Sequence, residues 1–144
     1  MKVAKYIVAT TALAASAPAF AEDWLLVSAN EKIWNFVDKD SVTANQFWFG
    51  VVYLNDRSKP ISKIRVEYRC PNREYRFVHL VVYNGELVPQ PHQNRDSNAS
   101  WVPAVPGSHI SAAIEYVCDG GEASSESVPS LEELWEFLKS EGKA

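Results

Sequence analysis

Few residues of this chain have the types and spacing that catalysis requires, and each has a simpler structural interpretation. Gly107-Ser108-His109 lacks the two glycines that flank the serine of a nucleophile elbow, so Ser108 is interpreted as a helix N-cap. His79 lies among apolar residues typical of a strand, which favours a packed or edge histidine over a catalytic base. His92 lies in a proline-rich loop and has no assignable partner. We therefore predict no catalytic residue.

The residues that could ligate a metal ion are poorly spaced for it. Asp38-Lys39-Asp40 brings two carboxylates together, but it lacks the third acidic position and the glycine of a calcium loop and therefore predicts a turn. The two cysteines are far apart and the three histidines are scattered, unlike the ligands of a zinc site. We expect neither a metal ion nor another cofactor.

The first 21 residues have the pattern of a signal peptide. Lys2 and Lys5 accompany an apolar run, and Ala19-Phe20-Ala21 has small residues at the two positions that a signal peptidase reads. We expect cleavage before Glu22 and no lipid anchor, because no cysteine follows the cleavage site. The apolar run is also shorter than the roughly 20 residues of a transmembrane helix. The mature chain is therefore expected to be exported, periplasmic or secreted.

Export determines how the cysteines are interpreted. Cys70 and Cys118 are the only two in the chain, and in an oxidising compartment they can form one intramolecular disulfide. Closing a loop of that length would remove about 4 kcal/mol of entropy from the unfolded chain. The alternative is a pair of buried free thiols.

Charge is unevenly distributed along the chain. The 144 residues carry a formal net charge of -4, which argues against a nucleic-acid binder. Residues 57–76 nevertheless hold seven basic residues against two acidic ones, and residues 119–144 hold the reverse. A row of arginines can engage the carboxylates of an acidic partner bidentately, and the acidic tail could itself shield this face until a stronger ligand displaces it. The alternative is a solvated sheet face whose charges keep the strands from aggregating. Trp101 is either an exposed anchor or a plug at the end of the core. The predicted partner-binding residues are Lys63, Arg65, Arg69, Arg76 and Trp101.

The elements that must position these residues begin with antiparallel strands. Apolar stretches rich in aromatic and β-branched residues alternate with short polar breaks. The fourth stretch alternates at period two, which places Cys70 on the core face and Arg69 on the solvated face. If Cys70 pairs with Tyr75, then Phe77, His79 and Val81 share the core face and Arg76 lies outside. We predict strands over residues 24–28, 32–37, 47–54, 63–70 and 75–83, and a short sixth strand starting at Leu87 and Val88.

Two helices are predicted after an irregular, proline-rich crossing over residues 89–107. The first begins after Ser108 and carries Cys118 at its end, so its apolar stripe should pack on the inner face of the sheet that holds Cys70. The second follows the capping box of Ser130 and Glu133, and its Leu and Trp135 stripe must dock on its own domain or on a second copy in a homodimer. We expect one domain over residues 22–121, followed by a linker and an acidic amphipathic helix over residues 122–144.

Several short motifs occur in a characteristic order over about residues 24–118. They are the Trp24 strand, Val37-Asp38 before Ser41-Val42, Phe47-Trp48, Tyr68-Arg69-Cys70 with Arg73 to Phe77, and Trp101 leading to Pro106-Gly107-Ser108 and Cys118. In this order the chain resembles the surface-adhesin protein E-like domain of Gram-negative bacteria. The resemblance implies an antiparallel sheet of about six strands, a helix held on its concave face by a disulfide, and adhesion to host matrix and serum proteins. The chain departs from the lipoprotein form of that adhesin at Glu22, where no cysteine receives lipid, and by its acidic extension.

Together these features predict an α+β domain, with an antiparallel sheet of about six strands, a helix disulfide-linked to its inner face and a C-terminal amphipathic helix. We expect an exported, non-enzymatic binding module of the bacterial cell envelope without a cofactor. Its partner would be a protein of the envelope or host matrix, recognised by a sheet face or loop. The alternatives are a small periplasmic hydrolase, an enzyme inhibitor and a structural envelope component. A pocket where polar groups converge would distinguish the hydrolase.

Overall fold

An antiparallel sheet forms the centre of the α+β fold. The computed structural model describes residues 22–90, 99–124 and 126–144, so the predicted signal peptide and His92 lie outside the described residues. The strands follow the order β6-β5-β4-β3-β2-β1-β8, and β7 pairs with the end of β5 that begins at Glu74. Their bounds are β1 Trp24–Ala29, β2 Ile33–Asp38, β3 Gln46–Tyr53, β4 Ile61–Arg69, β5 Glu74–Tyr83, β6 Pro89–Gln90, β7 Val102–Pro103 and β8 Ser127–Val128. The predicted antiparallel sheet is confirmed, but its sixth strand does not start at Leu87 and Val88 as predicted. β6, β7 and β8 are two-residue strands in segments predicted to be irregular. No helix in the described ranges is long and apolar enough to cross a membrane.

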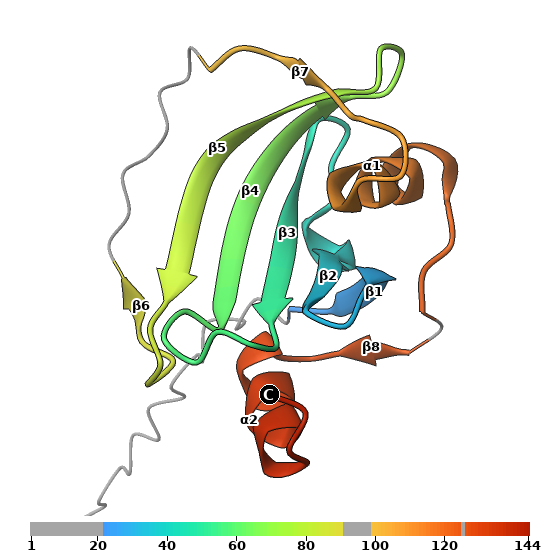
Figure 1. Ribbon diagram of the computed structural model, residues 1–144. Coiled ribbons are helices and arrows are strands. Elements are labelled where there is room, and N and C mark those ends of the chain that lie inside the picture. Colours follow the sequence, from blue (N-terminus) through green and yellow to red (C-terminus); the bar gives the residue numbers. More distant parts are fainter. Residues whose placement is uncertain (1–21, 91–98, 125) are drawn as a thin grey trace, which may run out of the picture.

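Helix α1 (His109–Asp119) packs on one face of the sheet, which we call the inner face. Ser108 caps its first turn by accepting a hydrogen bond from the backbone N–H of Ser111, and Gly120 ends it in the left-handed conformation, at φ 66°. The sheet curves around this helix (Figure 1). Buried residues of α1 and the inner face form one hydrophobic cluster: Val37, Phe47, Phe49, Val51, Val66, Tyr68, Ala113 and Ile114.

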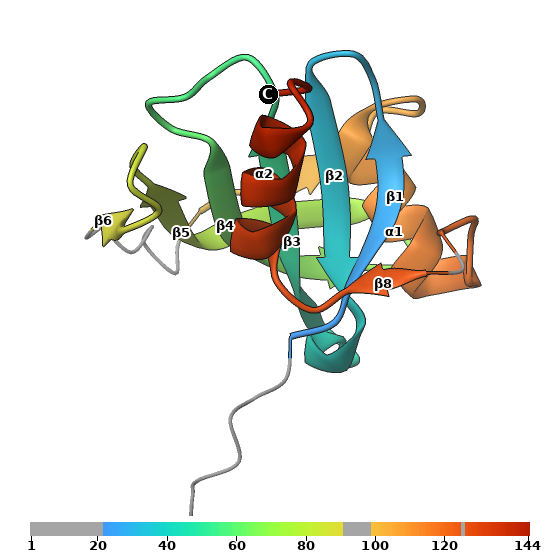
Figure 2. The same cartoon turned by 90° about the horizontal axis from the view of Figure 1, so that it is seen from below.

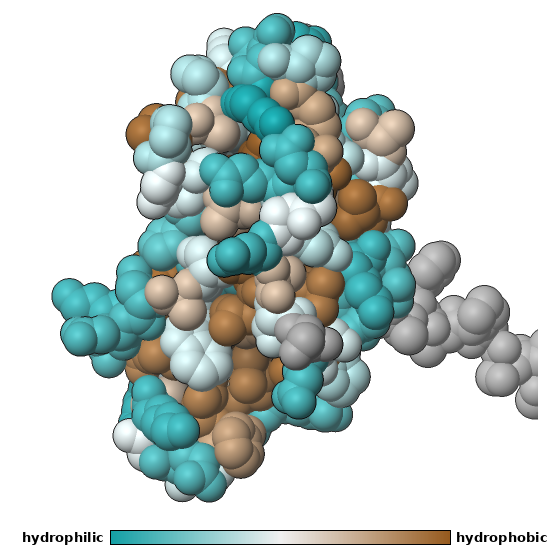
Figure 3. All heavy atoms as spheres, turned by 90° about the vertical axis from the view of Figure 1, so that its right-hand side faces the viewer, coloured by the Kyte–Doolittle hydropathy of each residue, from teal (hydrophilic) through white to brown (hydrophobic). Residues whose placement is uncertain are grey.

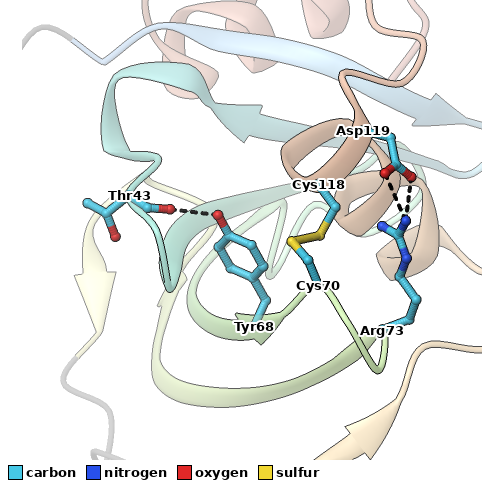
Figure 4. Close-up of a disulfide and its surroundings, with 6 residues drawn as sticks. All are labelled: Thr43, Tyr68, Cys70, Arg73, Cys118 and Asp119. Atoms are coloured by element: carbon cyan, nitrogen blue, oxygen red, sulfur yellow. Dashed lines mark hydrogen bonds and ion pairs between the residues drawn. A yellow bond between two sulfur atoms is a disulfide. The ribbon is translucent and has the colours of Figure 1, made fainter.

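A disulfide joins the end of α1 to the residue after β4. Cys70 and Cys118 are bonded, with their Cα atoms 5.6 Å apart, which confirms the predicted pair. Figure 4 shows two further contacts beside it. The hydroxyl of Tyr68 donates to the carbonyl oxygen of Thr43 at 2.6 Å, and Arg73 forms an ion pair with Asp119 at 2.6 Å. The β4–β5 turn is thus tied to α1 by a covalent bond and a neighbouring ion pair.

The register of β4 and β5 differs from the prediction. Tyr68, rather than Cys70, lies opposite Tyr75, and Val66 lies opposite Phe77. A bulge then places Arg65 opposite His79, so one extra residue of β5 reverses the alternation of its faces. Phe77 packs against the inner cluster as expected. The prediction that His79 and Val81 share that face is wrong, because beyond the bulge they lie on the opposite, outer face beside Trp48 and Lys63 respectively.

Helix α2 (Leu131–Ser140) covers part of this outer face. Figure 2 shows it in front of the sheet, with α1 behind β1. Three side chains of α2, each at most 1% exposed, join a second hydrophobic cluster with the outer face, whose buried members are Trp24, Phe36, Val52, Leu54, Ile61, Leu131, Trp135 and Leu138. A Cβ atom at Gly50 would lie 2.5 Å from Leu131 Cδ1, so the glycine allows the helix to approach closely. The helix therefore docks on its own domain by the predicted stripe.

The molecular surface reflects this two-sided packing. Figure 3 views the side of the molecule that carries α1. Its upper part is mostly hydrophilic, and hydrophobic atoms gather lower down, at the height of β1, β8 and α2. Leu26, Val128 and Leu134 of those elements are only partly buried and pack against the outer cluster. The edge of that cluster therefore reaches the surface.

Candidate functional site

The part of the outer face that α2 leaves uncovered carries most of the predicted partner-binding residues. Arg65 and Arg69 extend from β4, and Arg76 extends from β5. Trp101 is the residue that immediately precedes β7. Because β7 pairs with Glu74 and Tyr75 at the edge of the sheet, the side chain of Trp101 reaches the same face. The structure thus brings together four residues that were predicted from charge and residue type.

Three of these residues form a stack. The guanidinium carbon of Arg69 lies 3.8 Å from the ring centroid of Trp101, and that of Arg76 lies 4.7 Å from it. Arg76 also forms an ion pair with Glu67 at 2.7 Å and donates to the carbonyl oxygen of Ala99 at 3.4 Å. Such cation–π contacts contribute roughly 0.5–1 kcal/mol each at exposed sites. Trp101 therefore lies over charged groups at the sheet surface and orders them.

Lys63 is not part of the solvated row, and that prediction is wrong. Its side chain does extend from the outer face, but the residue is only 7% exposed. Its Nζ lies 2.9 Å from Glu22 Oε2 and 3.0 Å from Glu132 Oε1, and it also lies above the rings of Trp24 and Tyr83. Within the described residues, Lys63 is the member of the predicted row that the acidic C-terminal segment pairs with. Asp119 of the same segment pairs with Arg73, but the ion pairs of Arg69 and Arg76 are with Glu74 and Glu67, outside the acidic segment.

The Lys63–Glu132 pair shifts both pKa values. Burial alone would lower the pKa of Lys63, but the hydrogen bonds and charges of Glu22 and Glu132 outweigh it and raise the pKa above its ordinary value of 10.5. Burial would raise the pKa of Glu132, but the bonds from Lys63 outweigh it and lower the pKa below 4.5. The ion pair consequently stabilises the fold at pH values between the lowered pKa of Glu132 and the raised pKa of Lys63.

We expect this stabilisation to be lost as the pH falls through the folded-state pKa of Glu132, because the carboxylate must then be protonated. It should also be lost as the pH rises above 10.5 and through the raised pKa of Lys63. Melting temperatures of the wild type and Lys63→Met, measured from pH 3 to pH 9, check the acid limit. The variant should be clearly less stable at pH 7 and closer to the wild type at pH 3. A difference that stays constant over this range would contradict the assignment.

Arg65 lies beside a groove of about 730 Å³ on the outer face. It is exposed and forms no ion pair within the ranges that the structure describes. Asp38 lies in the same groove, and its burial raises the pKa of its carboxyl, although backbone N–H groups of Asp23 and Asp40 partly oppose this. The groove is lined by Glu22, Trp24, Asp38, Asp40, Ser41, Gln46, Phe47, Trp48, Lys63, Arg65, Val81 and Tyr83. Sequence reasoning missed this groove, because only the strand register brings its residues together.

A serine and a histidine meet elsewhere, and sequence reasoning also missed them. Asn30 Oδ1 accepts hydrogen bonds from the N–H groups of Lys32 and Ile33, so its Nδ2 must be the atom 3.3 Å from His109 Nε2. Since Nδ2 can only donate, Nε2 accepts and Nδ1 carries the proton that is donated to Ser28 Oγ at 2.6 Å. This tautomer does not take a proton from Ser28, so it does not activate the serine as a nucleophile. The pair ties the start of α1 to β1.

Comparison with known proteins gives one match. A family model described as surface-adhesin protein E matches residues 24–119. The match includes the five long strands, Trp101, both cysteines and α1, and it ends before β8 and α2. No curated protein and no solved structure matches the chain.

Proposed function

Because this chain belongs to the surface-adhesin protein E family, we propose that it is an exported binding module that recognises a protein partner through its outer sheet face. Membership of the family suggests an adhesin-like, non-enzymatic role and an exported or surface location. The partner would be a protein of the host matrix or of the bacterial envelope. The signal-peptide pattern of the first 21 residues supports export.

The stack of Arg69, Trp101 and Arg76 is the observation that carries this proposal. Tryptophan and arginine are the residues most enriched in binding hot spots. Here the stacking already orders long arginine side chains, which reduces the entropy lost when a partner binds. Arg69 retains binding capacity, because its side chain is 52% exposed and its contact with Glu74 is long, at 3.8 Å. An acidic segment of the partner would therefore meet an ordered guanidinium beside an indole ring.

We expect the double variant Arg69→Glu/Arg76→Glu to bind immobilised host-matrix and serum proteins at least tenfold more weakly than the wild type. Both substitutions place a carboxylate where the partner's carboxylates would lie, so repulsion replaces attraction. Surface plasmon resonance over a salt series measures the effect, and wild-type binding should weaken as the salt concentration rises.

Lys32→Glu/Lys59→Glu is a matched control, since it makes the same change of charge at exposed positions away from the stack. It should bind like the wild type. Equal losses in the two double variants would mean that net charge, rather than this stack, determines binding. Equal binding by all three proteins would assign the arginines to solubility.

A further inference from the structure

One residue from each of the five long strands lies at the same level of the sheet. Trp24 of β1 is opposite Asp38 of β2, which is opposite Trp48 of β3. Trp48 is opposite Arg65 of β4, and Arg65 is opposite His79 of β5. Directly opposed residues on one face have their Cβ atoms about 4.5–5.5 Å apart. The outer face therefore carries a cross-strand row in which Trp48 separates a carboxylate from a guanidinium.

Four residues of this row, Trp24, Asp38, Trp48 and Arg65, line the groove. Its volume of about 730 Å³ falls within the roughly 300–1,000 Å³ that small-molecule sites occupy. Lys63 and Glu22 line it too, but they neutralise each other at 2.9 Å. Val81 and Tyr83 supply apolar surface, and Gln46 and Ser41 supply neutral polar groups. Asp38, Asp40 and Arg65 are the further charged residues of its lining, and the remaining lining residues are aromatic, aliphatic or neutral polar.

Asp38 supplies a hydrogen-bond acceptor to this groove. The residue is only 8% exposed, and its Oδ1 accepts hydrogen bonds from the N–H groups of Asp23 at 3.1 Å and Asp40 at 3.2 Å. The carboxylate lines the groove, so its remaining acceptor capacity is open to a donor in the groove. Asp38 is therefore a fixed acceptor at the groove wall, held by two backbone N–H groups and placed to accept a hydrogen bond from a bound hydroxyl group.

Trp48 and Arg65 complete the arrangement. Trp48 is partly buried and its ring lies edge-to-face against His79, with the centroids 5.7 Å apart, so the indole is held in place. Arg65 is exposed on the other side of Trp48 from Asp38. The flat indole ring of Trp48 thus lies between the carboxylate of Asp38, which accepts hydrogen bonds, and the guanidinium of Arg65, which has several donors.

We propose that this groove binds a neutral saccharide, with a C–H face of one sugar ring on Trp48 and its hydroxyl groups bonded to Asp38 and Arg65. A hydroxyl group both donates and accepts, so hydroxyls around one ring satisfy the carboxylate and the guanidinium together. A purely anionic or purely cationic ligand would bring a like charge close to one of them. The saccharide site uses different residues from the Arg69–Trp101–Arg76 stack, so it does not depend on the proposed protein recognition.

Two-dimensional NMR of the protein purified from an exporting host tests this inference. The five tryptophans give five indole N–H signals, and Trp48→Phe identifies the signal of Trp48. Chitotriose, maltotriose and cellotriose are the probes. At least one should shift the Trp48 signal saturably and leave that of Trp101 in place. Arg65→Ala, a change at an exposed position that should not affect folding, and Asp38→Asn should each weaken binding at least tenfold, whereas Arg69→Glu/Arg76→Glu should leave it unchanged.

Three results would overturn the proposal: no saturable shift with any of the three sugars, unchanged affinity in both Arg65→Ala and Asp38→Asn, or a saturable shift of the Trp48 signal by pentalysine but by none of the sugars. The last result would assign the groove to a basic peptide. Circular dichroism of each variant verifies that the fold is intact. Because the stack variant is measured in both experiments, loss of protein binding with retained sugar binding separates the two sites.

Discussion

Trp135→Ala is expected to lower the free energy of unfolding by about 3–5 kcal/mol, the usual cost of removing a large aromatic side chain from a core. Trp135 is 1% exposed and lies among Trp24, Phe36 and Leu131 in the outer cluster. Truncation would leave a cavity between α2 and the sheet, and it would weaken the docking of a helix too short to be stable alone. Urea denaturation followed by circular dichroism measures the change.

Phe137→Ala is the matched control, because Phe137 belongs to the same helix and is 57% exposed. Its effect should stay within about 0.5 kcal/mol. If both variants lost the same stability, burial against the sheet would not explain the loss. An unchanged midpoint for Trp135→Ala would show that α2 does not pack on the sheet in solution.

Replacing both cysteines, as Cys70→Ser/Cys118→Ser, should destabilise the domain by about 4 kcal/mol. The bridge joins residues 48 positions apart, and a loop of that size removes about this much chain entropy from the unfolded state. The loss should concentrate where α1 meets the sheet, because Cys118 lies in the last turn of that helix. Urea denaturation of the double variant beside the oxidised wild type gives the difference.

Arg73→Ala distinguishes the stability contributed by the disulfide from that contributed by the neighbouring ion pair. It removes the ion pair with Asp119, whose two side chains are 42% and 54% exposed, and exposed pairs contribute at most about 1 kcal/mol. This variant should therefore lose much less stability than the cysteine variant. Thiols that titrate in the folded, oxidised wild type would refute the bridge itself.

The strands could be predicted because apolar runs alternate with turn residues over residues 24–83. The bulge in β5 could not be predicted. From Phe77 to Val82 the strand is apolar on both faces apart from His79, so alternation gives no sign that one extra residue shifts the register. The outer cluster has a clearer signal in the sequence. Phe47 to Val52 is an unbroken apolar run around one glycine, which is typical of a strand buried on both faces, and it indicates a second packing layer.

The site was predictable where charge and residue type suffice. Arg65, Arg69 and Arg76 follow from a basic segment on alternating strands and Trp101 from its residue type, and the structure adds the contacts that join Arg69 and Arg76 to Trp101. The burial of Lys63 was not predictable, because its partners Glu22 and Glu132 lie 41 and 69 residues away. The cross-strand row depends on the register of every long strand, which a sequence pattern alone does not determine.

The docking of α2 has a consequence for how the chain matures. A protein that crosses a membrane from its N-terminus delivers Trp24 long before Trp135, yet both belong to the same hydrophobic cluster. Until the final residues emerge, the outer face of the sheet remains uncovered. The inner layer can assemble earlier, since it is complete by Cys118. Translocation from the N-terminus should therefore impose an order on folding, in which the disulfide-linked layer assembles first and the arrival of α2 completes the outer cluster.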